Sequence, residues 1–343
     1  MNMQGLHEKK EGVILSVRNL STSFFTGSGE VKAVNGVSFD LEAGKVLGIV
    51  GESGSGKSVT AYSILQILTH PGRIVGGQVL YKGVDLVKFS QRQMREIRGE
   101  QISIIFQDPM TSLNPTYTVG NQIGEAIRLH TSRRGSEVRD RIVELLTLVG
   151  INEPQKRADQ YPHELSGGMR QRIMIAMAIA CEPDILIADE PTTALDVTIQ
   201  AQILELIQKL QDELGLAVIM ITHDLGIIAD MCDDIIVMYA GSIAERGSAD
   251  DIFYNPHHEY TKGLLHSIPT MEKTDDMLIP IAGSPVDMLA MPAGCPFAPR
   301  CPSAMKVCMT EMPEELEIGD GHFASCWMNV KDMVMAEAGE QHE

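Results

Sequence analysis

The chain of 343 residues lacks any run of about 18 apolar residues, so we expect no segment that crosses a membrane. Its polar start, Met1 to Gly12, has no apolar centre, and we expect no secretory signal. Acidic residues outnumber basic ones by 46 to 28, the formal net charge is −18, and no block of lysine and arginine stands out. Nucleic-acid binders usually carry a basic stripe, so DNA and RNA are disfavoured as main ligands.

The chain also lacks an internal repeat of fixed period. Its length favours one large domain with an addition, or two domains. A hydrophobic content of 44% is enough to build a sizeable core.

The most informative stretch that is present runs from Val46 to Ser58. Its first part, Val46 to Val50, is apolar and rich in β-branched residues, which predicts a buried strand. Gly51 to Ser58 then matches the phosphate-loop pattern G-x-x-x-x-G-K-[ST]. Glycines let the backbone approach a ligand, and the amides of the loop face an anion. Lys57 can reach the phosphates and Ser58 can hold Mg²⁺, so this motif by itself indicates an NTPase.

Periodicity predicts an α/β core that is interrupted by a mostly helical insertion between Gln107 and Pro162. The predicted strands are Val13–Leu20, Val37–Leu41, Gln78–Tyr81, Ile102–Phe106, Ile185–Ala188 and Ala217–Thr222, with a turn at Gly27 to Gly29 and a hairpin of Ile235–Tyr239 and Ile243–Arg246. The predicted helices are one after the phosphate loop with Ile64, Leu65 and Leu68 on one face, then Asn121–His130, Val138–Val149, Ile173–Ala180 and Val197–Leu214. Ile268 to Gly294, which holds Pro269, Pro280, Pro285 and Pro292, is predicted to be a linker or a wrapped extension.

A second helix start with bare backbone amides is predicted at Leu165 to Gln171, which reads Leu-Ser-Gly-Gly-Met-Arg-Gln. Ser166 is a good N-cap, and two glycines follow it. The stretch is either a second phosphate site or a capped helix that merely packs.

Polar residues follow two of the predicted buried strands. Asp189 and Glu190 come after one strand, and His223 comes after another. A strand-end carboxylate beside a phosphate loop suits Mg²⁺, and the next carboxylate is placed to polarise a water. A histidine at this end of a sheet is well placed for a ligand, since open α/β sheets bind ligands there.

Two aromatic residues, Phe24 and Phe25, lie just before the predicted turn upstream of the phosphate loop. An exposed aromatic side chain at this position could stack on a nucleotide base. The spacing supports a core aromatic equally well.

Four of the six cysteines, Cys295, Cys301, Cys308 and Cys326, lie near the C-terminus with 5, 6 and 17 residues between them. Structural disulfides are disfavoured in a reducing cytosol. Four thiolates suit zinc, although zinc sites usually space their ligands as C-x₂₋₄-C, and they suit a [4Fe–4S] cluster. The spacing leaves zinc and the cluster about even.

Taken together, these motifs closely resemble the ATP-binding subunits of ABC transporters. The match covers about residues 13 to 250 and keeps the order of the family's motifs, namely Gly51 to Ser58, Gln107, Leu165 to Gln171, Ile185 to Glu190, Asp196 and His223. Each motif alone is weak, but the combination is specific.

The resemblance implies an ATPase that works as a head-to-tail dimer with ATP and Mg²⁺. Catalytic roles are implied for Glu190 as general base, His223 as γ-phosphate switch and Gln107 as the residue that senses Mg²⁺ and the transported load. Mg²⁺ is expected at Ser58, Gln107 and Asp189. Nucleotide contacts are implied for Phe24, Gly51, Ser53, Gly54, Gly56, Lys57, Ser58, Asp196 and, from the other subunit, Ser166, Gly167 and Gly168.

Further motifs resemble the peptide-importer branch of this family, which also includes nickel and glutathione importers. They are Phe106 to Pro115, Tyr161 to Glu164, Pro256 to Thr261, and Cys295-Pro296 with Cys301-Pro302. The chain looks most like the D-type subunit for dipeptides and oligopeptides. That type implies two transmembrane permease subunits, a second and different ATP-binding subunit, an indirect link to an extracytoplasmic solute-binding protein, and a peripheral place on the cytoplasmic face of the membrane. It also implies a [4Fe–4S] cluster, rather than zinc, on the four cysteines.

The expected architecture is therefore an ABC-type P-loop core of the α/β class with an antiparallel β subdomain, a helical subdomain and an irregular, cysteine-containing C-terminal extension. We predict the nucleotide-binding domain at residues 1–260, its helical subdomain at about 108–172, and the extension at 261–343. A soluble ABC ATPase of translation or DNA maintenance is disfavoured, because the chain has neither a second cassette nor a long coiled-coil insertion. An exporter ATPase is disfavoured by the C-terminal segment.

Overall fold

The computed structural model describes residues 12–108, 112–193, 195–267 and 280–331. Several features of the sequence lie outside these residues: most of the polar start, Pro109 to Thr111 of the importer motif, Ala194, and the first part of the predicted linker with Pro269.

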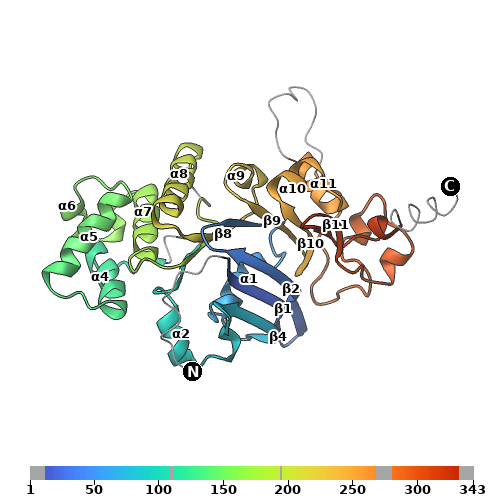
Figure 1. Cartoon of the computed structure of the whole chain (residues 1–343), viewed down its shortest axis with the longest axis horizontal. Coiled ribbons are helices and arrows are strands. Elements are labelled where there is room, and N and C mark those ends of the chain that lie inside the picture. Colours follow the sequence, from blue (N-terminus) through green and yellow to red (C-terminus); the bar gives the residue numbers. More distant parts are fainter. Residues whose placement is uncertain (1–11, 109–111, 194, 268–279, 332–343) are drawn as a thin grey trace.

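Strands in the described ranges form two sheets (Figure 1). One is 4-stranded and antiparallel, in the order β2-β1-β4-β5. Its strands are β1 (Val13–Thr26), β2 (Gly29–Glu42), β4 (Gly72–Tyr81) and β5 (Val84–Asp85). The predicted turn at Gly27 to Gly29 is confirmed, because Thr26 pairs with Gly29.

The second sheet is 8-stranded, in the order β11-β12-β10-β9-β3-β8-β7-β6. Its five strands from β9 to β6 in this order are parallel, and the hairpins β9–β10 and β11–β12 extend it. The strands are β3 (Val46–Val50), β6 (Ile102–Ile105), β7 (Ile185–Asp189), β8 (Ala217–Thr222), β9 (Asp234–Tyr239), β10 (Ser242–Ser248), β11 (Leu316–Gly319) and β12 (His322–Ala324).

Helices α4, α5 and α6 gather at one end of the molecule, and α10, α11 and the C-terminal extension lie at the other (Figure 1). The α-helices are α1 (Lys57–Ile64), α2 (Gln91–Ile97), α4 (Val119–His130), α5 (Ser136–Leu148), α6 (Pro154–Ala158), α7 (Gly167–Ala178), α8 (Val197–Leu214), α9 (Leu225–Ala229), α10 (Ala249–Tyr254) and α11 (Glu259–His266). Short 3₁₀ turns are η2 (Leu86–Lys88), η3 (Pro162–Glu164), η4 (Ala298–Arg300) and η5 (Val307–Met309).

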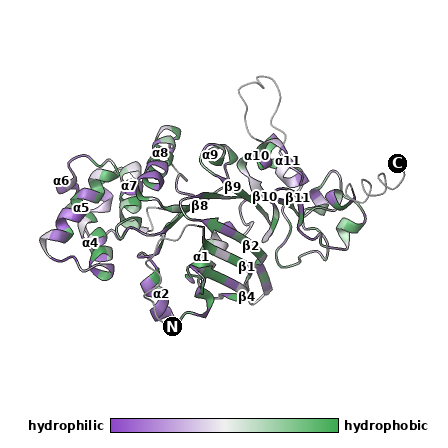
Figure 2. Ribbon diagram, in the orientation of Figure 1, coloured by the Kyte–Doolittle hydropathy of each residue, from purple (hydrophilic) through white to green (hydrophobic). Residues whose placement is uncertain are grey.

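The central strands separate two hydrophobic clusters, and Figure 2 shows how strongly apolar these strands are. Every residue of β3, β7 and β8 is buried. Successive side chains of a strand point to opposite faces, so Val46 and Val50 join one cluster and Leu47 and Ile49 join the other. Burial on both faces explains why these strands appear in the sequence as continuous apolar runs.

The helix after the phosphate loop is shorter than predicted. Helix α1 ends at Ile64, so Leu68 lies outside it and the predicted face of Ile64, Leu65 and Leu68 was wrong in its last member. Gln66 adopts a φ of 50°, which ends the helix. The turn is held by Arg98, whose guanidinium donates to the Leu65 carbonyl at 2.7 Å and to the Gln66 carbonyl at 2.8 Å.

The C-terminal extension contains more regular structure than the expected irregular tail. Strands β11 and β12 form a hairpin, and β12 pairs with β10 of the main sheet, with Ala324 opposite Glu245. The predicted division at residue 260 falls inside α11, and it remains a prediction. Among the described residues, no helix combines the length and apolar character that a bilayer crossing requires.

Candidate functional site

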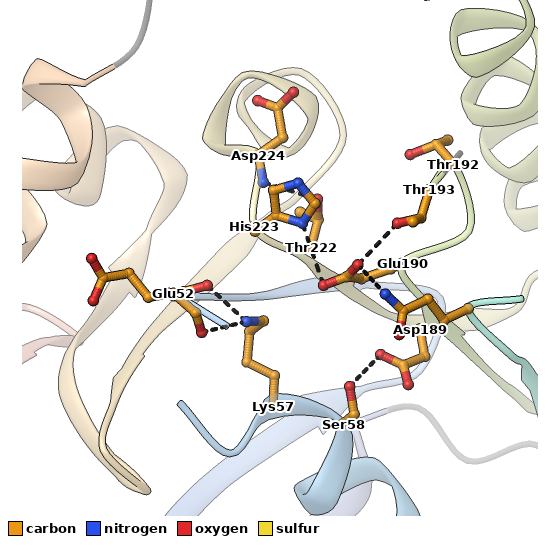
Figure 3. Close-up of polar contacts among 12 residues, drawn as sticks. Glu52, Lys57, Ser58, Asp189, Glu190, Thr192, Thr193, Thr222, His223 and Asp224 are labelled. Carbon is orange, nitrogen blue, oxygen red and sulfur yellow. Dashed lines mark hydrogen bonds and ion pairs between the residues drawn. The ribbon is translucent and has the colours of Figure 1, made fainter. Parts of the chain in front are cut away.

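The predicted site residues converge where four neighbouring parallel strands end. β3, β8, β7 and β6 lie side by side in the main sheet. Their carboxyl ends lead to the phosphate loop, to His223, to Asp189 with Glu190, and to Gln107. Figure 3 shows Lys57, Asp189, Glu190 and His223 close together. Carboxyl ends of parallel strands meet at one edge of a sheet. The fold therefore brings together four motifs that are far apart in the chain.

The phosphate loop has positions that only glycine can occupy. Gly51 has a φ of 148°, and a Cβ there would lie 2.1 Å from the Met238 carbonyl oxygen. Gly56 has a φ of 102°, and its Cβ would lie 2.4 Å from the Ala33 carbonyl oxygen. The loop therefore lies in direct contact with the backbone of β9 and β2.

Lys57 is buried inside the curve of the loop. Its ammonium group donates to the carbonyl oxygens of Gly51 at 2.7 Å and Glu52 at 2.9 Å. Burial lowers the pKa of Lys57, and the carboxylates of Glu190, Asp189 and Glu52 oppose that effect. A polyphosphate would offer this cation a stronger partner than two neutral carbonyls.

Asp189 supplies a carboxylate suited to Mg²⁺. The Ser58 hydroxyl donates to Asp189 Oδ1 at 2.8 Å, while Oδ2 is buried and has no hydrogen-bond partner. Burial raises the pKa of Asp189. Burial and Asp189 also raise the pKa of Tyr62, a neighbour that sequence reasoning missed. An orphaned buried carboxylate oxygen beside a hydroxyl fits a hard cation, which prefers oxygen ligands.

Glu190 lies at the centre of a second polar group (Figure 3). Gln107 Nε2 donates to Glu190 Oε2 at 2.7 Å, and His223 Nδ1 lies 3.3 Å from Oε1. Thr193, which sequence reasoning also missed, donates its hydroxyl to Oε2 at 2.9 Å. The spacing of three residues between Thr193 and Glu190 is a signal that could have found this contact.

The second helix start lies apart from this group. Ser166 caps α7, and its hydroxyl accepts from the Met169 amide at 3.4 Å. Asp196 caps α8, and its carboxylate accepts from the Ile199 amide at 3.1 Å. Within the described residues, no hydrogen bond or ion pair joins Ser166 or Asp196 to Lys57, Asp189 or Glu190. Ser166 and Gly167 are exposed to solvent.

The two phenylalanines differ in their surroundings. Phe24 is half-buried and lies so close to Gly72 that a Cβ there would be 2.6 Å from its ring. Phe25 is more exposed, and the Arg73 guanidinium lies 3.9 Å from its ring centre. Base stacking by Phe24 remains a prediction.

All four C-terminal cysteines line one cavity, together with His258, Glu259 and Trp327. Burial raises the pKa of the Cys295 thiol to about 11 and also raises the pKa of Cys301 and Cys326. In the ranges that the structure describes, no group of three or more histidine, cysteine, aspartate or glutamate side chains is placed to hold a metal ion.

The extension also reaches the phosphate loop, which the sequence did not predict. Arg300 donates to both carboxylate oxygens of Glu52, at 2.6 and 3.0 Å. The hydroxyl of Tyr260, which comes just before the predicted extension, accepts from the Glu52 amide at 2.7 Å. Arg300 and Glu52 are 248 positions apart, and no local pattern connects them.

A cavity of about 770 Å³ opens in the helical region. Its lining is mainly polar and includes Tyr117, which is 56% exposed. The lining residues are Ser112, Asn114, Tyr117, Asn121, Gln122, Glu125, Arg128 and Met177.

A phosphate loop, two strand-end carboxylates and a helical insertion on this sheet define an ATP-binding cassette of the ABC transporter class. Residues 34–193 match the ABC transporter family model, and residues 244–308 match the model for the oligopeptide/dipeptide transporter C-terminal region. The chain belongs to the oligopeptide/dipeptide family of ABC transporter ATP-binding proteins.

Its relatives extend over nearly the whole chain. It is 54% identical to the dipeptide transport ATP-binding protein DppD of Bacillus subtilis, over 92% of this chain and 94% of that protein. It is 47% identical to the oligopeptide transport ATP-binding protein OppD of Escherichia coli, over 96% of this chain and 97% of that protein.

A solved structure with a similar fold is the dimeric ATP-binding cassette MJ0796 in a post-hydrolysis state, bound to ADP and Pi. The TM-score is 0.62 at 27% sequence identity, over 68% of this chain and 98% of that one.

Proposed function

We propose that this chain is the ATP-binding and ATP-hydrolysing subunit that energises a membrane importer of dipeptides or oligopeptides. The observation that carries the proposal is the meeting of the phosphate loop with Asp189 and Glu190 at one sheet edge, in a chain with the C-terminal region of oligopeptide/dipeptide transporters. A nickel or glutathione importer of the same branch is the alternative, because the solute is chosen by other subunits.

The roles of the site residues follow from their contacts. Lys57 and the loop amides bind the phosphates of ATP, and Ser58, Asp189 and Gln107 hold Mg²⁺, which neutralises phosphate charge when bound. Glu190 orients the attacking water and accepts its proton. His223 and Gln107 both contact Glu190. His223 responds to the γ-phosphate, and Gln107 responds to Mg²⁺ and to the transported load.

A second ATP-binding subunit completes the site. Ser166, Gly167 and Gly168 lie at an exposed helix start that does not contact the chain's own phosphate loop, so we assign them to the nucleotide of the partner subunit. The similar solved cassette MJ0796 is dimeric, which supports this arrangement. We propose a heterodimer, as the D-type resemblance implies.

Two transmembrane permease subunits are the other partners. The 770 Å³ cavity beside the exposed Tyr117 can receive a protruding permease helix, and it lies in the chain segment that follows Gln107. Docking there would hold the chain peripherally on the cytoplasmic face of the membrane. The extracytoplasmic solute-binding protein then acts on it only through the permeases.

The four cysteines are proposed to hold a [4Fe–4S] cluster, with zinc as the alternative. The four thiols line one cavity, but they would have to move closer together to share a ligand, because no three of the described ligating side chains are placed to hold a metal ion. The wide spacing of the thiols departs from the usual zinc pattern. Such a cluster would tie Cys295 and Cys301 to the hairpin region near Cys326 and stabilise the extension. It requires no role in ATP hydrolysis.

Anaerobic purification tests the cluster. We expect brown protein with about four irons per chain, and Cys301→Ser should lose the colour and expose the extension to protease. The matched control is Cys181→Ser. Cys181 does not line the cavity of the four cysteines, so this change should leave the colour unchanged. Colourless protein with one zinc per chain would replace the cluster with a zinc site.

Purification and transport test the function. The tagged chain should bring down two hydrophobic permease chains and a second ATP-binding chain. The reconstituted complex should hydrolyse ATP faster with its solute-binding protein and a dipeptide or oligopeptide. Stimulation by nickel or glutathione alone would favour the alternative, and purification without any permease would contradict the importer proposal.

A further inference from the structure

The phosphate loop is held from outside by the C-terminal extension. Glu52 is the second residue of the loop, and its side chain points away from Lys57 (Figure 3). The Arg300 guanidinium donates one hydrogen bond to each oxygen of the Glu52 carboxylate. The side chain of Arg300 is only 4% exposed. Two parallel hydrogen bonds between planar groups fix direction as well as distance.

Arg300 is itself anchored on several sides. It donates to the carbonyl oxygens of Ala282 at 3.0 Å and Ile281 at 3.2 Å, and to the Tyr239 hydroxyl at 3.3 Å. Its 3₁₀ turn, η4, lies between Cys295 and Cys301. These contacts fix the guanidinium of Arg300, so the position of the Glu52 carboxylate depends on the position of the extension.

A second contact fixes the same loop residue through its backbone. The Tyr260 hydroxyl accepts from the Glu52 amide at 2.7 Å, and the Tyr260 ring packs on Tyr239 with 4.6 Å between centres. Pro285, Val286 and Met288 of the extension line a cavity with Glu52. The extension therefore covers one side of the loop.

We propose that Arg300 is a positioning residue of the ATP site, which holds the Glu52 carboxylate away from Lys57 and from the bound phosphates. Without Arg300, the Glu52 carboxylate would be free to turn toward Lys57, which lies on the same short loop. There it would compete with the phosphates for Lys57 and repel them. The extension thereby becomes a part of the nucleotide site. This inference rests on the proposed ATP-binding function.

Equilibrium binding of ATP to the purified full-length chain tests the proposal. Arg300→Gln should raise the dissociation constant about 10-fold, the scale of one uncompensated charge near an ionic ligand. Arg300→Lys keeps the positive charge but cannot donate two parallel hydrogen bonds, and it should raise the dissociation constant for ATP roughly threefold. Adding Glu52→Gln to Arg300→Gln removes the stranded carboxylate and should recover most of the lost affinity, which a general loosening of the extension would not allow.

The matched control is Arg246→Gln. Arg246 also pairs through two hydrogen bonds, with Glu315 at 2.8 and 3.0 Å, and it also joins the main sheet to the extension, but it does not contact the loop. We expect wild-type ATP affinity for this variant. Thermal midpoints without nucleotide show that each variant is folded.

Three outcomes overturn the inference: unchanged ATP affinity in Arg300→Gln, an equal loss in Arg246→Gln, or a double variant as weak as Arg300→Gln. Absence of ATP binding by the wild-type chain would instead refute the proposed function. The two failures are therefore distinguishable.

Discussion

At the residue scale, the two carboxylates at the end of β7 have different surroundings and suit different tasks. Asp189 is fully buried beside Ser58 and has an oxygen without a partner. Glu190 is held by Gln107 and Thr193 on one oxygen and faces His223 with the other. The last residue of β7 and the residue after it therefore have the surroundings that the proposed cation ligand and the proposed base require.

We expect Glu190→Gln to keep ATP binding but to lower ATP turnover of the assembled complex at least about 10²-fold, because the amide cannot accept the proton of the attacking water. The variant should also accumulate as an ATP-bound dimer on gel filtration. Glu205→Gln makes the same change on the exposed face of α8 and should keep normal turnover. Near-normal hydrolysis by Glu190→Gln would remove Glu190 from the role of base.

The raised pKa of Asp189 predicts how pH affects stability. The native state binds this proton more tightly than the unfolded chain, whose ordinary pKa is 3.8. The resulting stability is fully present below that pH and is lost as the pH rises through the raised pKa. Asp189→Asn does not ionise, so its nucleotide-free thermal midpoint should exceed that of wild type by about 2 °C at pH 8, with a smaller difference at pH 5.

Asp212→Asn provides the control for that comparison, because Asp212 is an exposed carboxylate of α8. It should show no such dependence on pH. Mg²⁺ with ATP should stabilise wild type and do so much less for Asp189→Asn. Equal midpoints of wild type and Asp189→Asn at both pH values would contradict the linkage between burial of Asp189 and stability.

At the element scale, α7 and α8 both begin with a side-chain N-cap. Ser166 and Asp196 each accept a hydrogen bond from the amide three residues later. Gly168 allows the two helices to approach closely, since a Cβ there would lie 3.0 Å from Ile199. The start of α7 is thus supported by α8, while Ser166 and Gly167 stay exposed.

Replacement of Asp196 separates capping from a contact with nucleotide. Asp196→Ala should lose about 1 kcal/mol of stability and roughly 2–4 °C in thermal midpoint, because the Ile199 amide loses its acceptor. Asp196→Asn should keep the midpoint, since asparagine caps equally well. ATPase assays of Asp196→Asn in the complex then report the nucleotide role alone. A midpoint for Asp196→Ala equal to that of wild type would show that the cap contributes nothing.

At the scale of the whole molecule, the phosphate loop and the exposed start of α7 are the two parts that we propose to meet across a dimer. The phosphate loop follows β3 of the main sheet, whereas α7 packs beside α4 and α5 (Figure 1). The extension at the opposite end reaches back to Glu52. In the composite site that we propose, hydrolysis depends on how two chains meet as well as on the fold of each.

We expect the isolated chain to be a poor ATPase whose turnover per chain rises with its concentration, because catalytic groups that meet only in a dimer separate on dilution. The permeases and the second subunit should raise turnover further by ordering the dimer. Steady-state assays over a range of chain concentrations measure this directly. High turnover that is independent of concentration, without any partner, would contradict the composite site.

Local features of the fold were predictable from the sequence. Helix α8 and strand β8 have the predicted ends, Val197–Leu214 and Ala217–Thr222, because caps and apolar periodicity act within a few residues. The phosphate loop was predictable for the same reason: its glycines and Lys57 serve one short turn. The hairpin of β11 and β12 was missed, because its short strands gain stability from pairing with β10 rather than from their own pattern.

Only the tertiary structure decided which of these features act together. The order of the parallel strands places Gln107 and His223 on Glu190, and packing against Arg98 ends α1 at Ile64. The pairing of Arg300 with Glu52 has no trace in the sequence. The physical reason is range: caps, turns and periodicity depend on neighbours within one or two turns of chain, whereas contacts between distant segments depend on how the whole sheet is assembled.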